Sequence, residues 1–202
     1  MWRSSWLGSA PRSAVLGALA AALAAPREAP AQEHGHGRDS AATAAARGVA
    51  EIPRSMKEEH AELNARLVAA TRAPGRVGEA AREVAKVLDP HFAREEQIAL
   101  PPLGLLRPLA EGRAPAGMAA VLPMTDSLKR ELPSMLTEHM AIGVAVKRLA
   151  RVAKDAGHAE AERLAHEIQR HALTEEEVTY PAAVLVGELV RARARRSAPA
   201  GP

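Results

Sequence analysis

The chain has 202 residues, with 27 basic and 24 acidic side chains, a formal net charge of +3 and no cysteine. This length suits one domain of ordinary size, which can bury a core without disulfides. The absence of thiols excludes redox pairs, thiolate metal sites and a disulfide framework, so any metal must be held by nitrogen and oxygen atoms.

Residues 1–31 have the features of a secretory signal peptide. Arg3 and Arg12 precede an apolar run of 13 residues, SAVLGALAAALAA, and residues 29–31 form the small-residue cleavage pattern APA. The run is shorter than the roughly 18–20 residues that cross a bilayer. We therefore expect signal cleavage, no stable membrane anchor afterwards, and an exported protein, periplasmic or secreted.

The charge and the aromatic content argue against a nucleic-acid partner. Segment 1–31 holds three arginines and one glutamate, so the rest of the chain has 24 basic and 23 acidic residues. The basic cluster RARARR at 191–196 ends the last expected helix, where cations complement the helix dipole. Both tryptophans lie within 1–31, which leaves Phe92 and Tyr180 as the aromatic residues. Stacking platforms for bases are therefore absent.

The remaining chain divides into three parts by composition. Residues 32–50 are small and polar without sustained apolar periodicity, so we expect a flexible arm. Residues 51–195 form the predicted domain, and 196–202 a disordered tail. Between the second and third helices of the domain, residues 101–124 are rich in proline, glycine and leucine. We expect this segment to be a crossover loop over one end of the core, with a lid or a homodimer contact as the alternatives.

Apolar stripes with spacings of three and four residues predict four long helices. The first helix ends before Pro74, the second before Pro101, and the third runs from about Asp126 to Asp155; the fourth starts near Ala159. Their stripes are Ile52, Met56, His60, Leu63 and Leu67; Val77, Ala81, Val84, Leu88, His91, Glu95 and Ile98; Leu128, Leu132, Met135, His139, Ile142, Val146 and Leu149; and Leu164, Ile168, His171, Glu175, Val178, Ala182, Leu185 and Leu189.

Two prolines lie inside the predicted helices. Pro90 is expected to kink the second helix just before its histidine, and Pro181 to kink the fourth. No segment shows the alternation of a strand, so the predicted fold is all-α, a four-helix bundle.

The two halves of the domain repeat each other. The pattern H-x-x-x-E-E-x-x-x-x-P occurs at His91 and again at His171, and a methionine, a glutamate and a histidine recur at equal spacing around His60 and His139. Two similar helix hairpins related by a pseudo-two-fold axis explain this duplication.

Six ionisable residues interrupt the apolar stripes and are expected to point inward, because positions i and i+4 share a helix face. They are His60, His91, Glu95, His139, His171 and Glu175. Burying two uncompensated carboxylates would consume much of a stability of only ~5–15 kcal/mol. Bound cations compensate this cost. His158 and His166 lie off the stripes and are expected to face solvent.

Imidazole nitrogen and carboxylate oxygen suit iron, manganese, zinc or copper, whereas calcium and magnesium prefer oxygen alone. Six donor residues are too many for one tetrahedral zinc. We therefore favour a dinuclear site with two iron ions, and keep manganese or zinc as alternatives.

The order of the motifs, H, H-x-x-x-E, H, H-x-x-x-E, resembles that of hemerythrin-like domains, the HHE cation-binding family, over about 52–190. The resemblance implies an up-and-down four-helix bundle around a non-haem di-iron centre. It also implies bridging glutamates, Glu95 and Glu175, with histidines completing the coordination.

The sequence departs from oxygen-carrying hemerythrins, which place two histidines four apart on the third helix and an aspartate five residues after the last histidine. Here His139 has Met135 and Gly143 at those offsets, and Glu175 follows His171 by four. The resemblance thus implies a metal that is more open or is filled by another group.

Several polar residues near the stripes have two interpretations. Glu59 and Glu138 either face solvent or orient a ligand, and Tyr180 either packs at a helix end or contacts a bound ligand. Glu176 and Glu177 are expected to face away from the site.

The sequence favours an exported di-iron protein that binds a small diatomic or peroxide ligand: dioxygen, nitric oxide or peroxide. Its role would be sensing, scavenging or iron handling. A di-iron oxidase or peroxidase-like enzyme and a metal-free interaction bundle are the alternatives.

Overall fold

The structure is a computed structural model that describes residues 51–197. The predicted signal peptide (1–31), the arm (32–50) and the end of the tail (198–202) lie outside these described residues. The long helices are α2 (Arg54–Thr71), α3 (Gly75–Ile98), α5 (Leu122–Asp155) and a continuous run of α6 (Ala159–Thr174), η3 (Glu175–Thr179) and α7 (Tyr180–Ser197). No strand occurs among residues 51–197.

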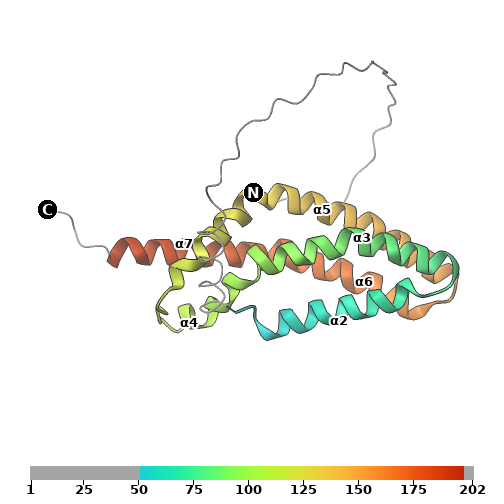
Figure 1. Ribbon diagram of the computed structural model, residues 1–202, viewed down its shortest axis with the longest axis horizontal. Helices are drawn as coiled ribbons and strands as arrows, with labels where there is room; N and C mark the ends of the chain where they lie inside the picture. The colour runs from blue at the N-terminus through green and yellow to red at the C-terminus, as the bar shows by residue number, and fades with distance from the viewer. Residues whose placement is uncertain (1–50, 198–202) are drawn as a thin grey trace, which may run out of the picture. The chain divides into compact units, whose positions relative to one another are not determined.

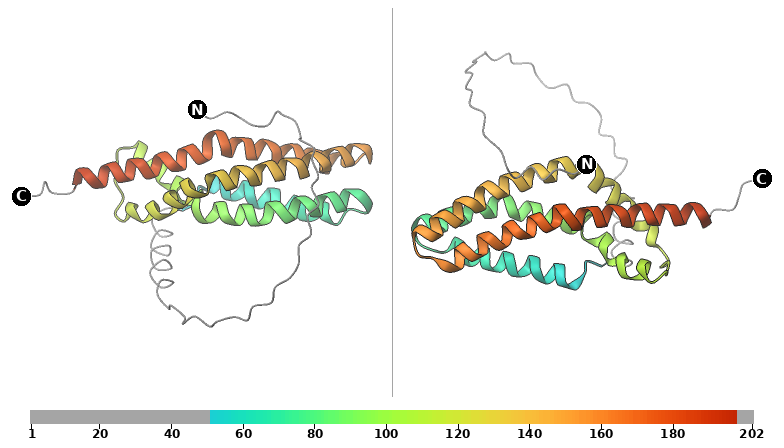
Figure 2. Two further views of the ribbon diagram at one scale, coloured as in Figure 1. Left: turned by 90° about the horizontal axis from the view of Figure 1, so that it is seen from above. Right: turned by 180° about the vertical axis from the view of Figure 1, so that it is seen from behind.

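The four long helical segments form an up-and-down bundle, which confirms the predicted fold class (Figure 1). Helix α2 packs against α3, α3 against α5, α5 against α6, and α6 against α2, so each helix has two neighbours. Short turns join α2 to α3 and α5 to α6 at the same end of the bundle (Figure 2). Gly157 completes the second turn with a left-handed φ of 67°, which a side chain would disfavour.

The interior changes character along the bundle. Near the turns it is apolar, with Leu67, Val84, Leu149 and Ile168 among its buried residues. A second apolar cluster lies around Leu100, Leu128 and Met135, where the helices leave the middle of the bundle. Along each long helix, the inward-facing histidine or glutamate lies between residues of the first cluster and residues of the second. Apolar packing therefore encloses these polar side chains from both ends of the bundle.

The segment 101–124 contains three short helices, η1 (Pro101–Leu105), α4 (Leu106–Ala110) and η2 (Met118–Val121). Their buried side chains pack against α7 in a third apolar cluster that contains Leu105, Leu109, Val121, Val186 and Val190. The segment thus covers the end of the bundle opposite the short turns, as the crossover interpretation expected. A homodimer contact stays a prediction.

Helix α5 begins at Leu122, earlier than the predicted start near Asp126. Pro123 lies at the beginning of the helix, where its missing N–H costs no hydrogen bond. Helix α3 continues through Pro90 as one element.

The predicted stripe of the fourth helix is wrong after Glu175. Val178 and Leu185 are 60% and 67% exposed, and Leu189 is also exposed. The buried residues are instead each one position later: Thr179, Ala183, Val186 and Val190. The reason is the π-turn η3, in which the Tyr180 N–H donates to the carbonyl of Glu175 five residues earlier. A π-turn takes in one extra residue, so the inward face moves by one position.

Within residues 51–197, no helix combines the length and the apolar character that a membrane-spanning segment needs.

Candidate metal centre

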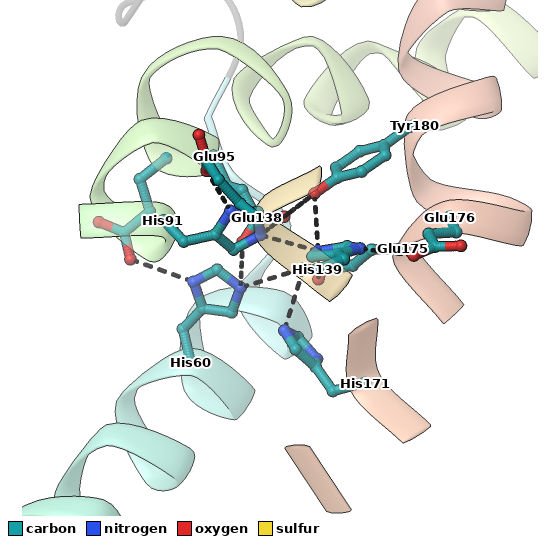
Figure 3. Close-up of polar contacts among 10 residues, drawn as sticks. His60, His91, Glu95, Glu138, His139, His171, Glu175, Glu176 and Tyr180 are labelled. Carbon is teal, nitrogen blue, oxygen red and sulfur yellow. Dashed lines mark hydrogen bonds and ion pairs between the residues drawn. The ribbon is translucent and has the colours of Figure 1, made fainter. Parts of the chain in front are cut away.

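All six residues that the sequence predicted to point inward are buried and meet in the middle of the bundle (Figure 3). Each long helical segment supplies one histidine, and the two glutamates come one turn after the histidines of α3 and α6. They are His60, His91, Glu95, His139, His171 and Glu175.

The two carboxylates each face more than one histidine. Glu175 places Oε1 at 3.0 Å from His171 Nε2 and 3.5 Å from His60 Nε2, while its Oε2 lies 3.5 Å from His139 Nε2. Glu95 places Oε1 at 3.4 Å from His91 Nε2 and Oε2 at 3.7 Å from His60 Nε2. The two oxygens of each carboxylate therefore point to different sides of the cluster.

The donor atoms form two groups, and both glutamates belong to each. One group joins His60 and His171 to the glutamates, and the other joins His91 and His139 to them. Donors that bind one ion at about 2.1 Å lie roughly 3–3.5 Å apart, close to the distances between these atoms. Both groups are therefore of a size that fits a metal ion.

Unpaired polar atoms support this fit. His60 Nε2, His171 Nε2, Glu95 Oε2 and both carboxylate oxygens of Glu175 are buried without a hydrogen-bond partner. Polar atoms in such a position are costly unless something binds them. The imidazole and carboxylate donors suit a transition metal. The cluster thus fits a metal site, while the ligand role of each residue stays a prediction.

A ring of four further carboxylates holds the outer nitrogens of the histidines. The contacts are His60 Nδ1 with Glu96 at 3.4 Å, His91 Nδ1 with Glu138 at 2.8 Å, His139 Nδ1 with Glu176 at 3.0 Å, and His171 Nδ1 with Glu59 at 3.2 Å. A carboxylate that accepts from Nδ1–H leaves Nε2 with a free lone pair, which is the state that binds a metal.

This ring decides between the two interpretations of Glu59 and Glu138 and corrects the interpretation of Glu176. Glu59 and Glu138 contact histidines, so solvation alone does not describe them. Glu176 was expected to face away, but it binds His139 and only its neighbour Glu177 is exposed. A residue one or five positions from an inward histidine points roughly 100–140° round the helix, toward the neighbouring helix. The repeat itself carried the signal, since both of its copies hold the second glutamate, Glu96 in α3 and Glu176 in η3.

Tyr180 also reaches the centre. Its side chain is fully buried, and its hydroxyl donates to Glu95 Oε1 at 2.5 Å. The Tyr180 hydroxyl oxygen also lies 3.2 Å from His139 Nε2 and 3.4 Å from His91 Nε2 (Figure 3). Of the two sequence interpretations, packing at a helix end does not account for this hydroxyl.

The charges of the cluster shift its protonation. Burial alone would lower the pKa of His91, but hydrogen bonds to Glu95 and Glu138 and the charges of Glu95 and Glu175 raise it to about 9. Burial likewise opposes protonation of His171, and Glu175 and Glu59 raise its pKa to about 9. Burial and the charge of Glu175 raise the pKa of Glu95. Without metal, protons on these groups balance the buried carboxylates.

The pKa of Glu175 moves the other way. Burial would raise it, but the neighbouring imidazoles of His139, His171 and His60 hold the pKa of Glu175 well below its usual range. Burial and the charge of Glu95 raise the pKa of Tyr180, which is therefore a neutral phenol in the absence of metal.

The two other histidines among residues 51–197 differ from the six. His166 is exposed, as predicted. His158 is partly buried and caps α6, where its Nδ1 accepts a hydrogen bond from the Ala161 N–H at 3.3 Å. Neither belongs to a donor group.

Comparison with known proteins agrees with this geometry. The sequence model of the hemerythrin HHE cation binding domain matches residues 51–183. No curated protein and no solved structure gives a match. The match covers most of the chain and all six inward residues, and the chain therefore belongs to the hemerythrin HHE cation-binding family.

Proposed function

We propose that this chain is an exported non-haem di-iron protein that binds dioxygen, nitric oxide or peroxide for sensing, scavenging or iron handling. The observation that carries the proposal is the division of the two glutamates between the two donor groups. Each carboxylate offers one oxygen to either side, which is the arrangement that two adjacent ions need.

The residues His60, His171, His91 and His139 would hold the ions through Nε2, and Glu95 and Glu175 would bridge them. Bound iron would supply Lewis acidity and reversible one-electron chemistry at positions open to a small ligand. Four donor atoms per group are fewer than an octahedral ion takes, so room remains for an exogenous ligand. Iron is preferred because of the family and the mixed nitrogen and oxygen donors; manganese and zinc are the alternatives that metal analysis distinguishes.

The protein contributes orientation and exclusion of water. The outer carboxylates fix the tautomer and the direction of each imidazole. The apolar clusters on both sides keep the centre buried, which strengthens electrostatic interactions there. Export rests on the signal-like features of residues 1–31 and on nothing else in the chain.

Metal analysis of the purified protein tests this function, together with visible spectra in air and after reduction. We expect two iron ions per chain, one for each donor group. The substitution His171→Ala should remove iron and the visible bands. His166→Ala is the matched control, because it alters an exposed histidine of the same helix and should change neither.

Each other outcome selects an alternative. If the wild-type protein is folded but contains no iron, this result would contradict the proposal and favour a metal-free interaction bundle. Peroxide turnover well above that of free iron would favour an oxidase or peroxidase-like enzyme. Export is tested separately, by the N-terminal sequence of the protein recovered from the native cell.

A further inference from the structure

The two donor groups differ in the aromatic residue beside them. His60 stacks on the ring of Phe92 with 4.0 Å between ring centroids, and His171 meets the same ring edge-on at 5.4 Å. Phe92 offers no donor atom. The group of His91 and His139 instead has the Tyr180 oxygen within 3.4 Å of both Nε2 atoms.

One of the two groups also has a pocket beside it. A pocket of ≈ 280 Å³ lies between α2 and α6, and its lining includes Glu59 and His171, a member of the Phe92 side. Leu63 and Thr174 line it together with charged residues of both helices, among them Arg66 and Glu167. Arg66 pairs with Glu167 and, at 3.0 Å, with Glu160, so this guanidinium joins the two helices at the pocket.

We propose that the Tyr180 oxygen coordinates the metal ion held by His91 and His139, and that an exogenous ligand reaches the other metal ion, held by His60 and His171, through the pocket between α2 and α6. This proposal rests on the proposed function, since it needs metal ions in both groups. When Tyr180 coordinates, its O–H bond breaks, the proton leaves to solvent, and an oxygen lone pair forms the bond to the metal. No electron is transferred.

The assignment follows from what each side offers. Tyr180 is the added oxygen donor on one side and fills space that a small ligand would otherwise take. Phe92 leaves the other side without a further donor, and the pocket brings solvent as far as His171. One side is therefore completed by the protein, and the other is left for a ligand that diffuses in.

Tyr180→Phe tests the first half of the proposal. In the ferric protein we expect wild type to show a phenolate-to-iron charge-transfer band, which the variant loses. Resonance Raman spectra excited in that band should show tyrosine ring modes. An unchanged visible spectrum in Tyr180→Phe at full iron content would overturn the assignment of Tyr180.

Thr174→Trp tests the second half, because Thr174 is exposed at the pocket and is not among the donors. Thr137→Trp is the matched control. Both threonines are exposed and mid-helix, and each Oγ1 donates to the carbonyl four residues earlier, at 3.0 Å and 2.9 Å. Thr137 lies on α5, away from the pocket.

The measurement is the rate of azide binding to the ferric protein and of nitric oxide binding to the reduced protein, by stopped flow. We expect Thr174→Trp to slow both by roughly tenfold or more, with iron content and spectrum unchanged, and Thr137→Trp to bind at the wild-type rate. Equal rates in the two variants would overturn the access route. An iron-free wild type would contradict the proposed function instead, so the two failures are distinguishable.

Discussion

The two helix hairpins share one sequence pattern but differ in the structure that follows it. In both, the residue five after the inward glutamate donates its N–H to the carbonyl of that glutamate: Leu100 to Glu95 at 3.0 Å, and Tyr180 to Glu175. A proline follows each time and contributes no N–H. In the first hairpin α3 has ended and a 3₁₀-helix begins, whereas in the second the helix continues as α7.

The difference shows how a duplicated site acquires two unlike sides. Leu100 and Tyr180 occupy matched positions, and both are fully buried. The duplication provides the histidines and glutamates in pairs, so these alone would give two equivalent groups. One matched position with leucine in one half and tyrosine in the other removes the equivalence and adds a hydroxyl to a single group.

The largest expected effect comes from removing one of the two carboxylates that we propose bridge the metal ions. Glu175→Ala should abolish binding of both ions, because Glu175 contacts three of the four histidines. Glu95→Ala should weaken both ions less, since Glu95 contacts two of them. Metal content after dialysis measures the difference.

Loss of only one ion in Glu175→Ala and in Glu95→Ala would contradict this expectation. Each glutamate would then serve one group, and the halves would act independently. Circular dichroism of the metal-free variants checks that both still fold.

The second prediction compares the outer carboxylates of the two halves, Glu96 and Glu176. Glu176 is 15% exposed and lies 3.0 Å from its histidine, whereas Glu96 is 48% exposed at 3.4 Å. Glu176→Gln should lower metal affinity by about 10- to 100-fold, the usual effect of losing such a partner. Glu96→Gln should cost less, because water already competes for its contact. Competition with a chelator gives both affinities, and equal losses would contradict the distinction.

The third prediction concerns pH, where the halves should behave alike. His91 and His171, one per hairpin, have pKa values raised from 6.5 to about 9 in the metal-free fold. A raised pKa gives stability that is complete below the unfolded value and is lost as pH rises through the folded value. The thermal midpoint of the metal-free protein should therefore fall between pH 6.5 and about 9.

Iron-loaded protein is the control for this pH effect. Metal replaces the protons on the donor nitrogens, so its midpoint should change little over the same range. A metal-free midpoint that rises from pH 6.5 to 9 would show that these histidines are neutral in the fold.

The smallest effect is expected from deleting Val178, an exposed residue of the π-turn. The deletion should turn η3 into regular α-helix and leave the α7 core residues in place, because a π-turn differs from an α-turn by one residue. Deleting Val144, which is 72% exposed in the regular helix α5, should rotate everything after it by roughly 100° and unfold the bundle. Thermal unfolding of both variants measures the contrast, and equal destabilisation would contradict it.

The fold and the inward position of the six donors were predictable from the sequence. Spacings of three and four residues place His91, Glu95 and their equivalents on one helix face whatever the neighbours are, so this information is local. The duplication then places His171 and Glu175 in the same way in the second half. The confirmed family match follows from the same residues.

The π-turn and the outer ring depend on information that is not local. Val178, Leu185 and Leu189 continue the apolar period, so the pattern gave no sign that the inward face shifts. The packing of α7 against α5 and the crossover segment selects the other set of residues. An exposed glutamate such as Glu59 looks the same in sequence whether it meets water or a histidine of the next helix, and only the position of that helix decides.

Because of the ring of outer carboxylates, the orientation of each histidine depends on a glutamate from a neighbouring helix. Glu59 of α2 serves His171 of α6, while His60, the next residue of α2, depends on Glu96 of α3. A rotation of one helix would thus misplace its own imidazole. It would also remove the carboxylate that fixes the tautomer of an imidazole on a neighbouring helix. High affinity would then exist only in the fully assembled bundle, so a misassembled chain would trap little metal.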